Sequence, residues 1–166
     1  MTFKRMVERD LDRKNRFRDA ALGLGEWEEH MRSFGVGQRL GIDLPSVKSG
    51  NLPGPAYYDR KYGQARWAFS TIYSVSIGQG EVLVAPLQMA NFAAIFANKG
   101  WYIDPHVVRA IGHPDSLQDR YRQKHFTSVD PKWYDLIHEG MRRVVHEPGG
   151  TARQARIAGI DMAGKT

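Results

Sequence analysis

The chain has 166 residues, 42% of them hydrophobic and 25% charged, which indicates one globular domain rather than a disordered or membrane-embedded chain. Lys and Arg outnumber Asp and Glu by 24 to 18, and because the basic residues are spread along the chain we interpret the net charge of +6 as a solvated surface. The absence of cysteine excludes disulfides, thiolate metal sites and a cysteine nucleophile.

The first 34 residues are predicted to be helical, because apolar and charged side chains mix at helical spacing. Gly23 and Gly25 favour a break within this region. We therefore expect a second helix from Glu26 to Phe34.

Residues 35–66 are rich in glycine and proline and are predicted to form a long loop region. At most one short strand is expected there, near Ile42 to Leu44. Loops of such length are usually functional coverings or insertions.

Residues 67–166 are expected to hold helices and strands. The clearest helix runs from Pro86 to Asn98, because proline suits the first helical turn and Gly100 suits the position after the end. Its many small residues predict deep burial. The other expected elements are a strand over Ile103 to Ile111, an exposed polar excursion over Gly112 to Phe126, a helix over Pro131 to His146 and a closing strand over Ile157 to Ala163.

The last eight residues, Gly159 to Thr166, fit the phosphate-loop pattern G-x-x-x-x-G-K-[ST]. Such a loop must open a helix whose N-terminal amides bind phosphate, and the sequence stops at Thr166. The residues between the glycines are also mostly apolar. A nucleotide-binding protein is therefore kept only as a lesser alternative.

A series of sequence blocks carries the most specific signal. In chain order they are FGVGQ (34–38), GIDLP (41–45), FSTIYSVSIGQGE (69–81), APLQMAN (85–91), NKG (98–100), PHVV (105–108), EGMRRVV (139–145), GTA (150–152) and AGKT (163–166). These blocks, from about Leu22 onward, closely resemble the elongation-type penicillin-binding protein 2 class. The charged stretch from Val7 to Asp19 is similar to Bacteroidetes-like members.

The resemblance implies the C-terminal part of an α/β (α+β) transpeptidase domain of the serine β-lactamase-like kind, with an antiparallel sheet flanked by helices. Residues 1–166 would be one incomplete domain. The whole protein would attack the D-Ala-D-Ala end of a peptidoglycan stem peptide through a serine and pass the acyl group to a neighbouring peptide's amine. It would also bind penicillin, and no metal or organic cofactor is implied.

Lys165 and Thr166 would begin the family's Lys-Thr-Gly motif, on an edge strand beside the nucleophile. The resemblance gives Lys165 a catalytic role, as a positive charge near the substrate carboxylate and in the proton-transfer network. Thr166 would bind substrate by donating a hydrogen bond to that carboxylate.

The family's nucleophile, a serine followed three residues later by lysine, does not occur in this sequence. Ser49-Gly50-Asn51 fits the family's Ser-x-Asn motif literally, but it lies in the Gly/Pro-rich region, and the family's motif precedes the first helical stretch. We therefore interpret Ser49 and Asn51 as a coincidental match. The chain alone is expected to be inactive.

Other chemistry is poorly supported by the residues. The histidines show no paired metal-ligand spacing: His30, His106, His113, His125, His138 and His146. Aromatic side chains interleaved with basic ones near Tyr57 to Trp67 could stack on nucleic-acid bases, but packing of the loop explains them more simply. Gln79 and Glu81 are expected to hold their turn by hydrogen bonding rather than to touch substrate.

The resemblance also implies partners and a location. The whole protein would work with a glycosyltransferase of the elongation machinery at the periplasmic face of the inner membrane. No targeting signal and no apolar run of the roughly 18 residues needed to span a bilayer occurs here, so any anchor is expected on other sequence. A non-catalytic binding module of the cell-wall machinery remains the main alternative.

Overall fold

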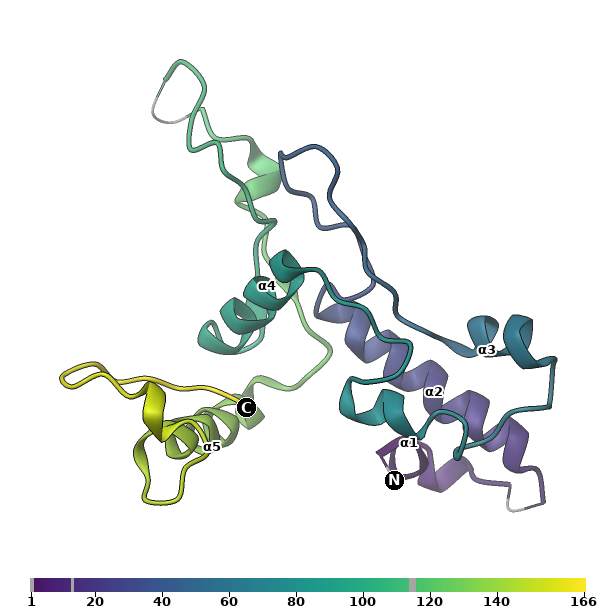
Figure 1. Cartoon of the computed structure of the whole chain (residues 1–166). Helices are drawn as coiled ribbons and strands as arrows, with labels where there is room; N and C mark the ends of the chain where they lie inside the picture. The colour runs from purple at the N-terminus through teal and green to yellow at the C-terminus, as the bar shows by residue number, and fades with distance from the viewer. Residues whose placement is uncertain (1, 13, 114–115) are drawn as a thin grey trace.

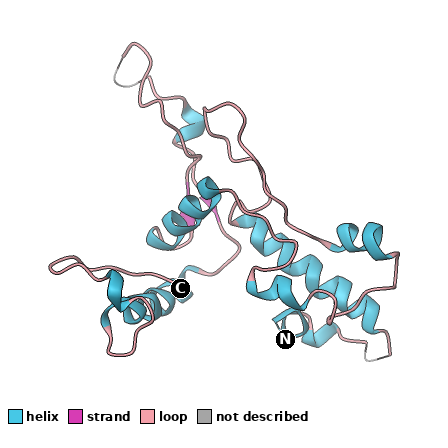
Figure 2. Ribbon diagram, viewed as in Figure 1, coloured by secondary structure: helices cyan, strands magenta, loops and turns pink. Residues whose placement is uncertain are grey.

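The computed structural model describes residues 2–12, 14–113 and 116–166. Its helices are α1 (Thr2–Met6), α2 (Arg16–Ser33), α3 (Pro55–Tyr62), α4 (Pro86–Ala97) and α5 (Tyr134–His146), joined by the short 3-10 helices η1 (Glu8–Asp10), η2 (Tyr73–Ile77), η3 (Asp119–Tyr121), η4 (Pro131–Trp133) and η5 (Arg153–Ala155). The strands β1 (Trp101–Tyr102) and β2 (His125–Phe126) pair antiparallel, with Trp101 opposite Phe126. Figure 1 shows α1 to α3 at one end of the molecule, α4 in the middle and α5 with the C-terminal segment at the other end, and Figure 2 separates the helices from the long loops.

The long helix α2 is continuous, so the predicted break at the two glycines is wrong. A Cβ at Gly23 would lie 2.5 Å from the carbonyl oxygen of Phe3, and glycine is therefore needed there for the close approach of α1 to α2. Asn15 caps the helix, because its side chain accepts a hydrogen bond from the amide of Arg18. The helical prediction for the first 34 residues is otherwise confirmed for the greater part of that region.

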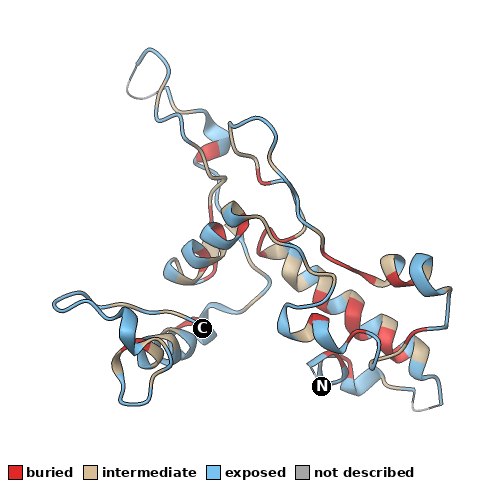
Figure 3. Cartoon of the chain, in the orientation of Figure 1, coloured by how far each residue is buried: buried red, intermediate tan, exposed pale blue. Residues whose placement is uncertain are grey.

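The core gathers around α2, as the buried residues in Figure 3 show. Leu24 from α2, Tyr58 from α3 and Ile95 from α4 are all fully buried. The predicted mixture of helices with an antiparallel sheet is therefore present, although the sheet in the described residues is small.

The region predicted as loop contains helix α3, which the sequence analysis missed. Pro55 lies in the first turn of α3, and Gly63 ends it with a φ of 92°. The short strand expected near residues 42–44 is also absent from the described backbone. The β-bridge of this region forms instead between Asn51 and Leu83, whose backbones exchange hydrogen bonds of 2.7 and 2.9 Å.

Helix α4 confirms the predicted helix to within one residue. Its expected deep burial is wrong for this chain, because only Gln88, Asn91 and Ile95 are buried while Met89 is 54% exposed. Gln88 connects this helix to residues 35–49 by hydrogen bonds. Its Nε2 donates to the carbonyl oxygens of Gly35, Gln38 and Ser49 at 2.8 to 3.2 Å.

No strand forms over the described residues 103–111, contrary to prediction. The carboxylate of Asp43 accepts the amides of Val107 and Val108 at 2.9 and 2.8 Å, so these donors are taken by a side chain rather than by a neighbouring strand. Nearby, a Cβ at Gly41 would lie only 2.3 Å from Oδ2 of Asp104. The loops that contain these two residues are therefore in direct contact.

The predicted polar excursion over residues 112–126 lies partly outside the described residues, and its described part contains η3 and β2. The predicted helix over 131–146 is confirmed as η4 followed by α5. The closing strand expected over 157–163 does not form: within this range the amide of Met162 donates to the side chain of His146 on α5, and the amide of Ile160 donates to the carbonyl of Ile157. None of the helices in the described ranges is long and apolar enough to cross a membrane.

Candidate functional site

Lys165 and Thr166 stand at the end of an extended segment that lies along α5. The amide of Gly164 donates to the carbonyl of Met141 at 3.1 Å, and the amide of Met162 donates to Nε2 of His146 at 3.1 Å. These two bonds attach alternate residues of the segment to the helix. These bonds therefore fix the backbone of the residues that immediately precede Lys165 in the sequence.

The hydroxyl of Thr166 contacts the hydroxyl of Thr151, with an Oγ1–Oγ1 distance of 2.6 Å. Thr151 belongs to the Gly-Thr-Ala block just after α5, whose turn is closed by a bond from the amide of Ala152 to the carbonyl of Val144. A Cβ at Gly150 would lie 2.4 Å from the same carbonyl oxygen, so only glycine fits there. The structure thus brings together two sequence blocks, Gly-Thr-Ala and Lys-Thr.

Polar side chains on α5 also face the C-terminal segment at Asp161. Nε of Arg142 donates to Oδ1 of Asp161 at 3.0 Å, and Nε2 of His146 lies 3.3 Å from the same oxygen. Lys165 itself is exposed, as is Thr166. An exposed ammonium and an exposed hydroxyl are groups that can bind an anion such as a carboxylate.

A hollow of about 380 Å³ lies between α4, α5 and the C-terminal segment. Phe96, His138 and Met162 are among the residues that line it. Nε2 of His138 is already engaged there, because it contacts the carbonyl oxygen of Phe96. The hollow thus lies between α4 and α5, and Nε2 of the histidine that lines it is bound by the fold.

Ser49 and Asn51 serve to hold the loop. The side-chain amide of Asn51 donates to the carbonyl of Glu81 at 2.6 Å, and the carbonyl of Ser49 accepts from Gln88. The hydroxyl of Ser49 is exposed and donates to the neighbouring Gly50 carbonyl at 3.3 Å. These contacts agree with a structural role for the pair.

Glu81 connects the Gly-Gln-Gly-Glu turn to α3, so the predicted hydrogen bonding is confirmed for this residue. Its carboxylate accepts the hydroxyl of Tyr58 and the ammonium of Lys61, each at 2.7 Å. Lys61 and then Tyr58 keep the pKa of Glu81 below its usual value, while burial and Glu81 raise the pKa of Tyr58. Gln79 contributes its backbone amide, which donates to Ser74. The partners on α3 were missed because that helix was predicted as loop.

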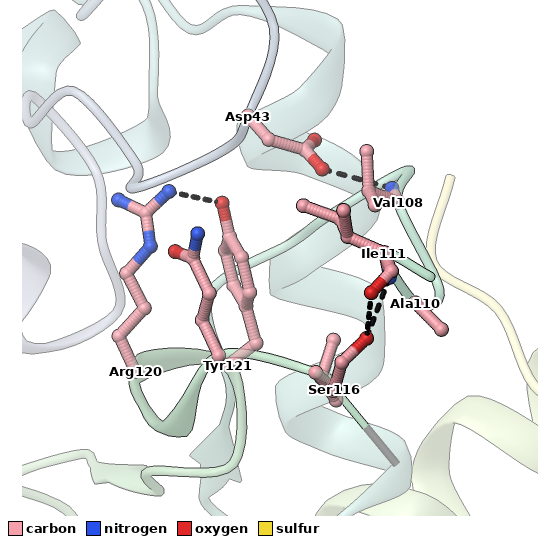
Figure 4. A pocket seen from close by; sticks show the side chains of 9 residues that line it. Asp43, Val108, Ala110, Ile111, Ser116, Arg120 and Tyr121 are labelled. Carbon is pink, nitrogen blue, oxygen red and sulfur yellow. Dashed lines mark hydrogen bonds between the residues drawn. The ribbon is translucent and has the colours of Figure 1, made fainter. Parts of the chain in front are cut away.

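A small pocket lies apart from Lys165 and Thr166, between the loop at Asp43 and the segment that contains Tyr121 (Figure 4). The amides of Val107 and Val108 hold the pKa of Asp43 below its usual value. The hydroxyl of Ser116 is engaged by the backbone of Ile111, with contacts of 2.6 and 2.7 Å. The carboxylate of Asp43 and the hydroxyl of Ser116 are thus both engaged by backbone groups of the fold.

Within the described residues, no group of three or more His, Asp or Glu side chains is placed to hold a metal ion. The histidines have other contacts: Nδ1 of His30 lies 2.5 Å from the hydroxyl of Ser128, and the rings of His106 and His125 lie against Tyr121 and Tyr102.

Residues 14–166 match the penicillin binding protein transpeptidase domain family. The chain is 36% identical over 148 residues to the peptidoglycan D,D-transpeptidase MrdA of Acinetobacter baumannii, covering 87% of this chain and 21% of that protein. It thus spans about a fifth of the length of this curated relative.

Two solved structures share the arrangement of the backbone. PBP2 of Pseudomonas aeruginosa, solved in complex with WCK 5153, gives a TM-score of 0.68 at 30% identity, over 83% of this chain and 31% of that one. PBP2 of Helicobacter pylori, solved in complex with MreC, gives a TM-score of 0.67 at 26% identity, over 84% of this chain and 25% of that one.

Proposed function

Because the chain belongs to the penicillin-binding protein transpeptidase domain family, we propose that it is the part of a peptidoglycan D,D-transpeptidase that places Lys165 and Thr166 at the substrate. It would form one segment of a single transpeptidase domain. The nucleophilic serine, its lysine and the Ser-x-Asn pair would come from sequence other than these residues. No cofactor is needed for this acyl transfer.

The contact between the hydroxyls of Thr151 and Thr166 is the observation that best supports this role. Two hydroxyl groups carry two protons, and their mutual hydrogen bond uses only one of them. The second proton remains available for a ligand. A stem-peptide or β-lactam carboxylate beside Thr166 would accept it, while the exposed ammonium of Lys165 would stabilise the negative charge.

In the reaction proposed for the whole protein, the serine attacks the carbonyl carbon of the penultimate D-Ala and expels the terminal D-Ala. An amine of a neighbouring stem peptide then attacks the acyl-enzyme ester and restores the serine. Lys165 and Thr166 would orient the terminal carboxylate before the first step. Their contribution is positioning and charge, which explains why a segment without a nucleophile can still carry part of the site.

The location and partners of the whole protein are part of the proposal. We place it at the periplasmic face of the inner membrane, working with a glycosyltransferase of the elongation machinery. Two observations support this: the similarity to a peptidoglycan D,D-transpeptidase, and the similarity to a PBP2 that was solved in complex with MreC.

Covalent labelling by penicillin, read as intact mass, tests the proposal. The chain itself is compared with a chimera in which its residues 14–166 replace the matching stretch of the Acinetobacter relative. We expect an adduct on the chimera only, and slower labelling in Lys165→Ala and Thr166→Val chimeras than in a control with Lys124→Ala. A folded chimera that forms no adduct would favour a non-catalytic binding module, and an adduct on the short chain would point to a nucleophile such as Ser49.

A further inference from the structure

His146, the last residue of α5, contacts two different groups of the C-terminal segment through one atom. Its Nε2 accepts the amide hydrogen of Met162 at 3.1 Å and lies 3.3 Å from Oδ1 of Asp161. The imidazole is largely buried, with 14% of its side chain exposed, while the side chain of Asp161 is 73% exposed. One ring nitrogen thus faces both a hydrogen-bond donor and a carboxylate.

These two contacts exclude each other chemically. An imidazole nitrogen accepts a hydrogen bond only when it carries no proton, and it donates to a carboxylate only when it carries one. The neutral ring with its proton on Nδ1 can therefore hold the amide of Met162. The doubly protonated ring cannot accept that amide and is instead attracted to Asp161.

The charged groups around the ring decide what protonation changes. Asp161 faces it from the C-terminal segment, and Arg142 stands one turn earlier on α5, donating to the same carboxylate at 3.0 Å. Arg143 is directed elsewhere, with its Nε 2.8 Å from Glu139. Since a carboxylate offers several acceptor positions, Asp161 can accept from Arg142 and a charged His146 together.

We propose that His146 is a positioning residue. Its protonation state determines whether the backbone just before Lys165 and Thr166 in the sequence is bonded to α5 at Met162. In the neutral state, the bonds of Met162 and Gly164 to α5 flank Ala163 and fix the course of the segment. In the protonated state, Met162 is released and the bond of Gly164 remains. The consequence for acylation rests on the proposed function, whereas the exchange of partners by His146 does not.

Amide hydrogen exchange of the full chain, measured by NMR, tests the exchange of partners directly. The protection of Met162, corrected for the intrinsic rate at each pH, should fall about fivefold to tenfold between pH 7.5 and pH 5, which corresponds to the net contribution of one hydrogen bond. The amide of Gly164, bonded to Met141, should stay protected and reports that α5 remains folded.

Substitutions at position 146 separate the outcomes. His146→Gln supplies an amide oxygen that does not titrate, so Met162 should stay protected at both pH values, whereas His146→Phe should leave it unprotected at both. His138→Gln on the same helix is the matched control and should behave as the unchanged chain. A fall that persists in His146→Gln, or full protection in His146→Phe, would overturn the inference.

The chimera then tests the positioning role. The ratio of penicillin acylation rates at pH 7.5 and pH 5 should be larger with His146 than with His146→Gln, because the pH dependence of the remaining site is common to both. Equal ratios would refute the role in positioning Lys165. A chimera that is not acylated at all would count against the proposed function, and the exchange of Met162 would still decide whether His146 changes partners.

Discussion

Replacing Glu81 by alanine tests whether one carboxylate joins the Gly-Gln-Gly-Glu turn to helix α3. Its Oε2 accepts the hydroxyl of Tyr58 and its Oε1 accepts the ammonium of Lys61, each at 2.7 Å. Tyr58 is fully buried, so the substitution leaves its hydroxyl without this acceptor. The exposed pair with Lys61 is given no weight, because surface ion pairs contribute little.

The expected loss in the free energy of unfolding follows from these contacts. A buried hydroxyl left without a partner costs about 1–3 kcal/mol, so we expect about 2 kcal/mol for Glu81→Ala. Tyr58→Phe removes the donor instead and should cost about 1 kcal/mol. Because the two side chains share one hydrogen bond, the double variant should cost less than the sum of the single ones.

Urea unfolding followed by tryptophan fluorescence measures these values, since the ring of Trp67 packs 5.3 Å from that of Tyr58. A cost below about 0.5 kcal/mol for Glu81→Ala, or strictly additive single effects, would refute the reasoning.

The depressed pKa of Glu81 fixes the pH dependence of this contact. A carboxyl group whose pKa is lowered on folding contributes stability above its unfolded pKa, and that contribution is lost as the pH falls through the folded value. The difference between the unchanged chain and Glu81→Gln should therefore be constant near neutral pH and shrink below about pH 4. A difference that grows in acid would have the wrong sign.

Three further tests address other parts of the fold. Gln88→Ala should lower the free energy of unfolding by about 3 kcal/mol, because several loop carbonyls lose a buried donor, and the urea midpoint measures this. Gly37→Ala should be more destabilising than Gly112→Ala in the same assay: both have positive φ, but a Cβ meets Leu52 at 2.4 Å in the first and nothing within 4 Å in the second. Asp43→Ala should speed amide exchange at Val107 and Val108, and unchanged exchange there would contradict the bonds described above.

Local signals in the sequence predicted a helix well where both its start and its end, or its apolar spacing, could be recognised. Pro86 and Gly100 bracket α4, and the apolar spacing of residues 131–146 gave η4 and α5. The same Pro-to-Gly signal brackets α3, from Pro55 to Gly63, but it was outweighed by the high glycine and proline content around it. Composition over a long window thus concealed a short helix with good ends.

The strands were predicted less well, because pairing depends on partners that local sequence does not identify. Residues 103–111 have strand-like composition, yet the carboxylate of Asp43, far away in sequence, takes two of their amides. The segment before Lys165 likewise bonds to α5. For the contact between Thr151 and Thr166, the only signal in the sequence is that both residues lie in the sequence blocks of the resemblance, because a threonine by itself does not indicate a site.

The close approach of Gly41 to Asp104 limits how the two loops can diverge among related proteins. Any side chain at position 41 would displace the Asp104 carboxylate, whose Oδ1 lies 3.4 Å from Nε2 of His125 on β2. We therefore expect the three positions to vary together among relatives, although they are far apart in the chain. An alignment of relatives should show larger residues at position 41 mainly where position 104 has lost its carboxylate.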